Sequence, residues 1–217
     1  MSAGNIYDKL RAAGMSHAGA CAMLGNMEAE SSLRPDNLQN SYEKKLGFVD
    51  GLYTAAVDSG SYKSFAADSA GYGLCQWTYG PRKRNLLSFA ESRGVSIGDE
   101  NMQLDFAVQE LKSEYIGLWS FLCCTEDIYT ATERICEEFE RPAVNNVDTR
   151  YAFALKWDKE FGGEAEKPWF PPDLSILVLQ SVLVGNGYNT EISGHKSGQF
   201  LEMLAEFVRD IGGGEHA

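Results

Sequence analysis

The chain has 217 residues, of which 44% are hydrophobic and 23% charged, a composition typical of a globular protein with a sizeable core. Acidic residues outnumber basic ones by 31 to 19, and such a chain is repelled by phosphate backbones, so we expect no nucleic-acid partner. No stretch approaches the roughly 20 apolar residues that a membrane helix needs, and we expect no membrane insertion.

The first two predicted helices lead to a glutamate. Residues 5–13 have the apolar spacing of an amphipathic helix, which Gly14 ends. Ser16 is a suitable N-cap for a second helix over about 17–30. Alanine and glycine are frequent in this second helix, so neighbouring elements can approach it closely and we expect it to be buried. It ends at Glu30, shortly before a proline.

Residues 36–80 follow a different pattern, with frequent glycine, tyrosine and phenylalanine and no strong helical signal. We expect loops with one short β-hairpin here, and such long irregular stretches are often functional. Helical patterns return over about 82–93, 99–115 and 148–161, and after Thr125 at the spacing of Ile128, Ala131, Ile135 and Phe139. The sequence therefore predicts an α+β, mainly α domain over 1–162 with one small irregular or β lobe.

The C-terminal residues predict a separate piece. Glycines and prolines indicate a linker over 163–172, followed by a short helical region over 173–212 and a flexible tail over 213–217. About 40 residues are marginal for an independent core. We therefore expect the short helical region to pack on the main domain or on another copy of the chain.

Cysteine and histidine patterns argue against several enzyme classes. The five cysteines include no Cys-x-x-Cys pair, and an odd number indicates reduced thiols in a reducing compartment. The three histidines form no His-Glu-x-x-His pattern, so a zinc hydrolase is disfavoured and we expect no metal and no cofactor. A Cys–His peptidase is disfavoured too, because His17 is the sole histidine in the main domain.

The end of the second helix offers two carboxylates, Glu28 and Glu30. They lie about 200° apart around the helix, so only one can face a given cleft. A carboxyl at a buried helix end can have the raised pKa that a glycosidase acid requires. Spacing alone leaves open the alternative of two solvated glutamates.

A family resemblance favours the catalytic interpretation. Glu30-Ser31 followed by Gly71-Tyr72-Gly73-Leu74-Cys75-Gln76-Trp77 resembles the paired motifs of the lysozyme-like superfamily, which includes lytic transglycosylases. With Gly25-Asn26, Pro35, Asp68, Thr78, Arg82-Lys83 and Phe139-Glu140-Arg141-Pro142, the pattern resembles the phage tail-type lysozyme domain over about residues 4–161. The resemblance implies a lysozyme-like fold, with Glu30 as the catalytic acid and segment 71–77 lining the sugar cleft.

Seven further residues are candidates for glycan contact: Asn26, Asp68, Tyr72, Gly73, Gln76, Trp77 and Glu140. Glycine allows close backbone approach, Gln76 can hydrogen-bond a sugar, and tyrosine or tryptophan rings can stack on one. Structural alternatives stay open: Trp77 as a core aromatic, Gln76 bonded back to the protein, Glu140 as part of a structural ion pair. Asp68 is the first candidate for a general base, before Asp50 and Asp58, and some superfamily members use none.

The resemblance implies an endolysin-type hydrolase of the β-1,4 glycan strands of bacterial peptidoglycan. The first residues lack a signal peptide's apolar core, so we expect the host cytoplasm until release, or alternatively the virion tail. A non-catalytic tail or wall-binding protein and a lytic transglycosylase are the alternatives, whereas a peptidase or amidase lacks its residue sets. Leu179-Gln180 and Gly187-Tyr188 resemble the opening of a small peptidoglycan-binding domain, so the C-terminal helices bind wall, form oligomers or only pack.

Overall fold

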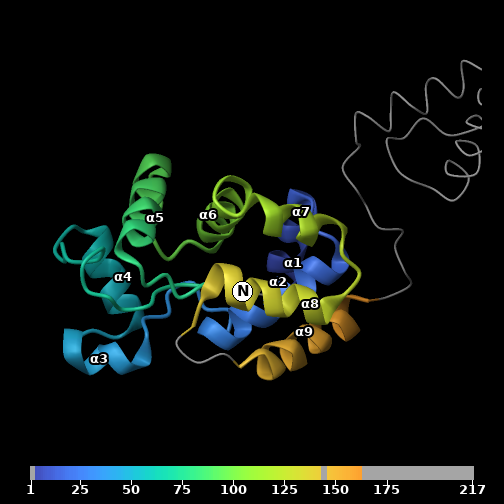
Figure 1. The fold of residues 1–217 in the computed structure, drawn as a ribbon. Helices are drawn as coiled ribbons and strands as arrows, with labels where there is room; N and C mark the ends of the chain where they lie inside the picture. Colours follow the sequence, from blue (N-terminus) through green and yellow to red (C-terminus); the bar gives the residue numbers. More distant parts are fainter. Residues whose placement is uncertain (1–2, 143–145, 163–217) are drawn as a thin grey trace, which may run out of the picture. The chain divides into compact units, whose positions relative to one another are not determined.

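The computed structural model describes residues 3–142 and 146–162, and within these ranges it consists of helices joined by loops (Figure 1). The helices are α1 (Ala3–Ala13), α2 (His17–Ser31), α3 (Asn40–Leu46), α4 (Asp50–Asp58), α5 (Gly80–Arg93), α6 (Glu100–Ser113), α7 (Ile116–Cys124), α8 (Ile128–Arg134), the π-helix η1 (Ile135–Glu140) and α9 (Val147–Phe161). The prediction of a mainly α domain is confirmed. The predicted linker, helical region and tail after residue 162 lie outside the described residues.

The prediction of a β-hairpin within residues 36–80 was wrong. This segment contains α3 and α4, and its β pairing is one isolated antiparallel bridge between Leu38 and Tyr72. Helices of 7 and 9 residues are too short to show a clear period among the surrounding glycines. Tyr53 and Val57, four residues apart, nevertheless bury one face of α4.

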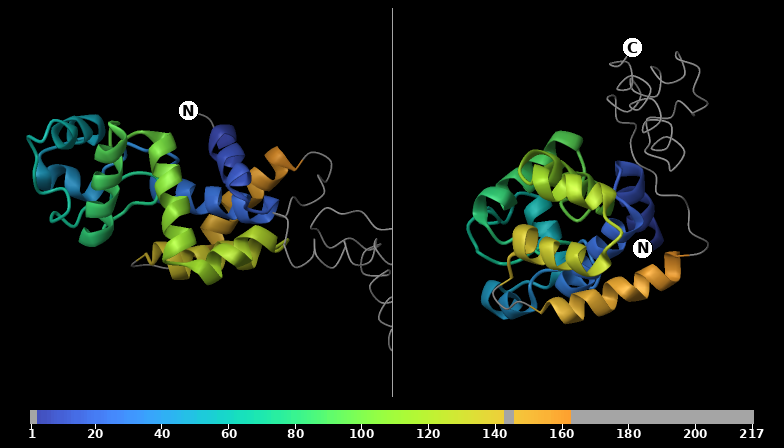
Figure 2. Two further views of the ribbon diagram at one scale, coloured as in Figure 1. Left: turned by 90° about the horizontal axis from the view of Figure 1, so that it is seen from above. Right: turned by 45° about the vertical axis from the view of Figure 1, so that its right-hand side comes forward.

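The described helices form two groups. Figures 1 and 2 place α3, α4 and α5 on one side and α1, α2, α7, α8 and α9 on the other, with α6 between them. Helix α2 packs against α1, α7, α8, η1 and α9 and is buried along most of its length, as the sequence predicted. None of the described helices is long and apolar enough to cross a membrane.

The N-cap of α2 fixes where the helix begins, and a glycine within it allows a second helix to pack closely. The Ser16 side chain caps the helix by accepting from the Gly19 backbone N–H at 2.9 Å, as predicted. A Cβ on Gly25 would lie 2.5 Å from the backbone oxygen of Arg150, a distance shorter than real Cβ contacts. Glycine at this position therefore lets α9 lie directly on α2, and this brings Arg150 towards the end of α2 that carries Glu30.

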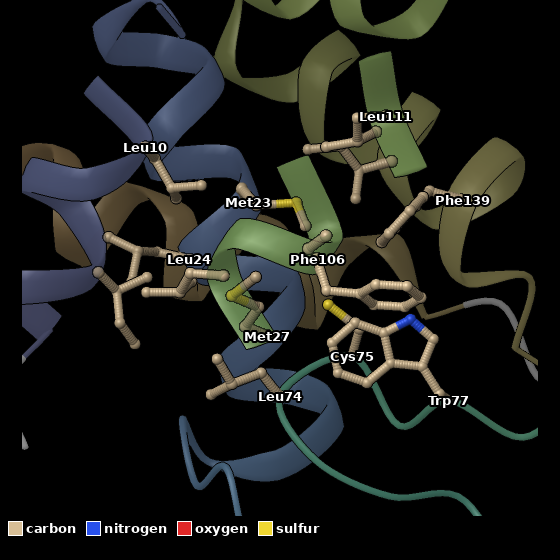
Figure 3. Close-up of a cluster of buried hydrophobic side chains, with 14 of the residues drawn as sticks. Leu10, Met23, Leu24, Met27, Leu74, Cys75, Trp77, Phe106, Leu111 and Phe139 are labelled. Carbon is tan, nitrogen blue, oxygen red and sulfur yellow. The ribbon is translucent and has the colours of Figure 1, made fainter. Parts of the chain in front are cut away.

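The core joins α2 to the predicted glycine-rich segment. Figure 3 shows Met27, Leu74, Trp77, Phe106 and Phe139 among the clustered side chains, and each is at most 2% exposed. These residues come from α2, the 71–77 segment, α6 and η1. The shared core fixes the 71–77 segment relative to the last turn of α2.

Candidate active-site groove

A groove with a volume of about 1550 Å³ collects residues from distant parts of the chain. It is lined by the end of α2, the 69–82 segment, α5, α6 and η1, through residues that include Glu30, Gln76, Tyr79, Glu110, Tyr115 and Glu140. A smaller hollow of about 390 Å³ is also lined by Glu30 and Gln76. The predicted acid and the predicted 71–77 segment therefore border the same concave surface.

Glu30 lies on the groove in contact with a buried arginine. The Arg150 guanidinium donates from Nη2 to Oε1 of Glu30 at 2.5 Å. The Glu30 side chain is 16% exposed and that of Arg150 is 4% exposed, so the ion pair is open to the groove from the glutamate side. Charge-assisted contacts of this kind fix a carboxylate in position.

Asn26 holds this arginine and does not reach the groove. Its Oδ1 accepts from Nη1 of Arg150 at 3.2 Å, and its Nδ2 donates to the backbone oxygens of Ala22 and Thr132. The side chain is fully buried, so the predicted role in glycan contact is wrong. The alternative role, orienting the acid, agrees with the contacts, but it acts through Arg150.

Glu140 is the second carboxyl on the groove, and it comes from the last residue of η1. Burial raises its pKa well above the ordinary 4.5, and the nearby Glu30 carboxylate raises it further. Arg82, Arg150 and the Cys75 thiol only partly offset these effects. Oε1 of Glu140 is buried without a hydrogen-bond partner. Burial and the missing partner both disfavour the charged form of this carboxyl.

The 71–77 segment turns sharply beside both carboxyls. Gly73 has φ of 76°, and a Cβ there would lie 2.6 Å from the Gln103 side chain. Gln76 lines both hollows, while its Nε2 donates to the backbone oxygens of Asn37 and Gly73. The structural bond expected for Gln76 as an alternative is therefore present. Gly73 shapes the turn and is buried, whereas Gln76 borders the groove.

Two aromatic residues predicted to stack on sugars belong to the core. Tyr72 is fully buried and shares a 2.6 Å hydrogen bond with Thr54. Trp77 is also fully buried, packs on Phe106 and donates from Nε1 to Glu110 at 2.8 Å. The sequence of the 71–77 segment alone did not indicate that the Tyr72 and Trp77 rings both point into the core.

Asp68 is also buried, which corrects its predicted role as a general base. Its carboxylate accepts from Lys83 at 2.6 Å and from Tyr62 at 3.1 Å, and the ion-pair side chains are 2% and 0% exposed. Lys83 also donates to the Ala70 backbone oxygen, so the ion pair anchors the start of the 71–77 turn. The other two candidates, Asp50 and Asp58, accept from the backbone N–H groups of Leu38 and Ile97.

Strained backbone gathers around the groove. In the described ranges the non-glycine residues with left-handed φ are Ser32, Leu33, Ser69, Gln76 and Arg141. Ser32 and Leu33 closely follow Glu30, Arg141 follows Glu140, and the remaining two line the groove. Such strain is concentrated at functional sites, because the surrounding fold must hold it.

Sequence reasoning missed Arg150 and Tyr79. Arg150 lies 120 positions from Glu30, so no local pattern could pair them. Tyr79 is 69% exposed on the groove, directly before α5, and supplies the open aromatic face that Tyr72 and Trp77 do not. A tyrosine just before the Gly80-Pro81 helix start was the available signal.

Among the described residues, the one cluster suited to a metal ion is His17, Cys21 and Asp158, and none of these lines either hollow.

A buried central helix that presents a glutamate to a groove, opposite a glycine turn, is characteristic of lysozyme-like helical domains. A family model described as phage tail lysozyme matches residues 2–161, and the chain belongs to this family. Membership indicates, at a coarse level, a phage-associated protein of lysozyme-like function that acts on peptidoglycan.

Proposed function

We propose that the protein hydrolyses the β-1,4 glycan strands of peptidoglycan in this groove, using Glu30 and Glu140 as a carboxyl pair. The observation that carries the proposal is that Glu140, whose Oε1 is buried without a partner, lines the same groove as Glu30. Glycoside hydrolysis needs a carboxyl that is still protonated near neutral pH, and burial together with the neighbouring Glu30 carboxylate favours the protonated form of Glu140. The pair therefore meets the first requirement of the reaction.

Within this proposal the two glutamates have different roles. Glu140 holds the proton before a glycan binds, because its Oε1 is buried without a hydrogen-bond partner. Glu30 is the general acid, because it borders both hollows and a sugar spanning them would contact it. The proton passes from the pair to the glycosidic oxygen as the C–O bond breaks. Water then supplies hydroxide to the sugar carbon and returns a proton to the pair.

Arg150 and Asn26 are positioning residues in this scheme. Arg150 fixes the Glu30 carboxylate in the empty site, and Asn26 fixes Arg150. Glu30 must weaken its bond to Arg150 when it takes up the proton, since a neutral carboxyl binds a guanidinium less strongly. Arg150→Lys, which cannot donate to both partners in the same plane, is expected to lower kcat more than it changes KM.

Turbidity loss of purified cell walls tests the proposal. Glu30→Gln removes the acid, and a loss of about 10²–10⁴ in rate is expected. Glu140→Gln is the sharper variant, because the amide imitates a protonated carboxyl in shape and charge but cannot supply its proton. A passive Glu140 would leave the rate unchanged, whereas the proposed role predicts a loss. Glu91→Gln, an exposed carboxyl on α5, is the matched control.

Product analysis separates the proposal from its alternatives. New reducing ends without new amino groups support a glycosidase and exclude a peptidase or amidase. A 1,6-anhydro sugar in the digest would assign a lytic transglycosylase with the same glutamate. Wall binding by the unmutated protein without any cleavage would contradict the proposal and favour a non-catalytic tail or wall-binding protein.

A further inference from the structure

A second polar cluster joins α2 to α9, away from the groove. His17 and Cys21 lie one turn apart on α2, and Asp158 lies near the end of α9. Their ligand atoms are all within 4.8 Å of one another. Nε2 of His17 is 2.8 Å from Oδ1 of Asp158 and 3.7 Å from Sγ of Cys21. His17 is therefore close in space to both a cysteine and a carboxylate.

We propose that His17, Cys21 and Asp158 bind one divalent transition-metal ion of the zinc type. Nitrogen, sulfur and carboxylate oxygen are the donors that zinc takes in proteins, with a water completing a tetrahedral site. Bond lengths of about 2.0–2.3 Å imply donor separations of roughly 3.3–3.6 Å around such an ion. The sulfur–nitrogen distance already fits, the nitrogen–oxygen pair needs to open by about half an ångström, and the sulfur–oxygen pair, which lies within 4.8 Å, needs to reach about 3.6 Å.

Tyr7 supports the orientation that this site requires. Its hydroxyl lies 2.7 Å from Nδ1 of His17, and this contact leaves Nε2 facing Asp158 and Cys21. A metal-bound histidine usually donates its other ring N–H to such an oxygen, which fixes the tautomer. The tyrosine oxygen can accept this hydrogen bond, so the imidazole needs no rotation to coordinate an ion.

The exposure of the three side chains fits a site that loads from solvent. The side chains of His17 and Asp158 are 34% and 40% exposed, whereas Cys21 is fully buried beneath them. Burial, followed by the charge of Asp158, raises the pKa of the Cys21 thiol to about 12. A nucleophilic role is therefore disfavoured. An entering ion displaces the thiol proton, so binding forms the metal–sulfur bond and releases one proton to solvent.

The consequence is a cross-link between two helices that also carry the groove's ion pair. Glu30 is on α2 and Arg150 is on α9, so an ion at the other end of these helices stabilises their packing. Because the ion binds only the folded arrangement, zinc is expected to raise the unfolding temperature. Its effect should not depend on Glu30, and a failed hydrolase assay would leave this inference standing.

Cobalt(II) is the spectroscopic probe, and zinc is the probe for stability. The full-length Cys123→Ser, Cys124→Ser protein, freed of metal by chelation, serves as the parent, because it lacks the two more accessible thiols of the described ranges. One cobalt per chain should give a thiolate-to-cobalt charge-transfer band and release one proton. Zinc should raise the unfolding temperature of the same protein.

Three variants locate the ion. Cys21→Ala should remove the charge-transfer band, and the more exposed Asp158→Asn should weaken cobalt binding at least tenfold while the chain still folds. His195→Gln, outside the described residues, is the matched histidine control and should change neither readout. Absence of stoichiometric binding by the parent would overturn the proposal. So would a charge-transfer band that survives Cys21→Ala, or unchanged affinity in Asp158→Asn.

Discussion

Replacing Glu140 with glutamine should stabilise the fold at neutral pH. The folded-state pKa of Glu140 is raised above its ordinary 4.5, so the folded protein keeps a proton that the unfolded chain loses above this pH. The associated stability is fully present below about pH 4.5 and falls as pH rises towards the folded-state pKa. The slope is about 1.4 kcal/mol per pH unit, so the loss reaches at most about 3.5 kcal/mol by pH 7.

Urea unfolding, followed by tryptophan fluorescence at several values between about pH 5 and 8, measures this effect. The difference in free energy of unfolding between Glu140→Gln and the unmutated protein should grow with pH in favour of the variant. Glu91→Gln, an exposed carboxyl, should show no such growth. A difference that stays constant with pH would refute the reasoning, because Glu140 would then titrate alike in both states.

Three further predictions follow from the contacts. Asp68→Asn leaves Lys83 buried without its charge partner, so urea unfolding should show a loss of about 3–5 kcal/mol, whereas a surface general base would cost almost nothing. Gly25→Val forces α9 away from α2 and should lower both the unfolding temperature and the rate of wall lysis; equal lysis at equal stability would contradict the packing argument. Tyr79→Ala should weaken glycan binding in calorimetry without changing the unfolding temperature, since the ring is 69% exposed.

The helices that surround the core could be predicted because their apolar residues recur at helical spacing. The predicted 5–13 and 17–30 correspond to α1 and α2, and Ser16 caps α2 as expected. Helices α3 and α4 could not be predicted, because each is so short that tertiary packing outweighs its own pattern. Helix α7 was missed for a related reason: its residues are apolar nearly throughout and show no periodicity.

The positions of candidate residues were predicted correctly where a motif fixes the backbone. They were predicted wrongly where only the side-chain type was known. Glu30 and Gln76 border the groove as expected, because a helix end and a glycine turn fix their places. Tyr72, Trp77 and Asp68 point into the core, and residue type does not determine which way a side chain points. Arg150 was invisible in the sequence, because its contact with Glu30 depends on how α9 lies on α2.

The π-helical turn before Arg141 determines which way the Glu140 side chain faces. The wider winding of this turn is seen in one hydrogen bond: the Arg141 N–H donates to the Cys136 backbone oxygen, five residues earlier. Winding the same residues as an ordinary α-helix would turn the following side chain by about 100°. Glu140 would then leave the groove although no residue in contact with a glycan had been replaced. The position of Glu140 on the groove therefore depends on the π winding of 135–140 as well as on the identity of the residue.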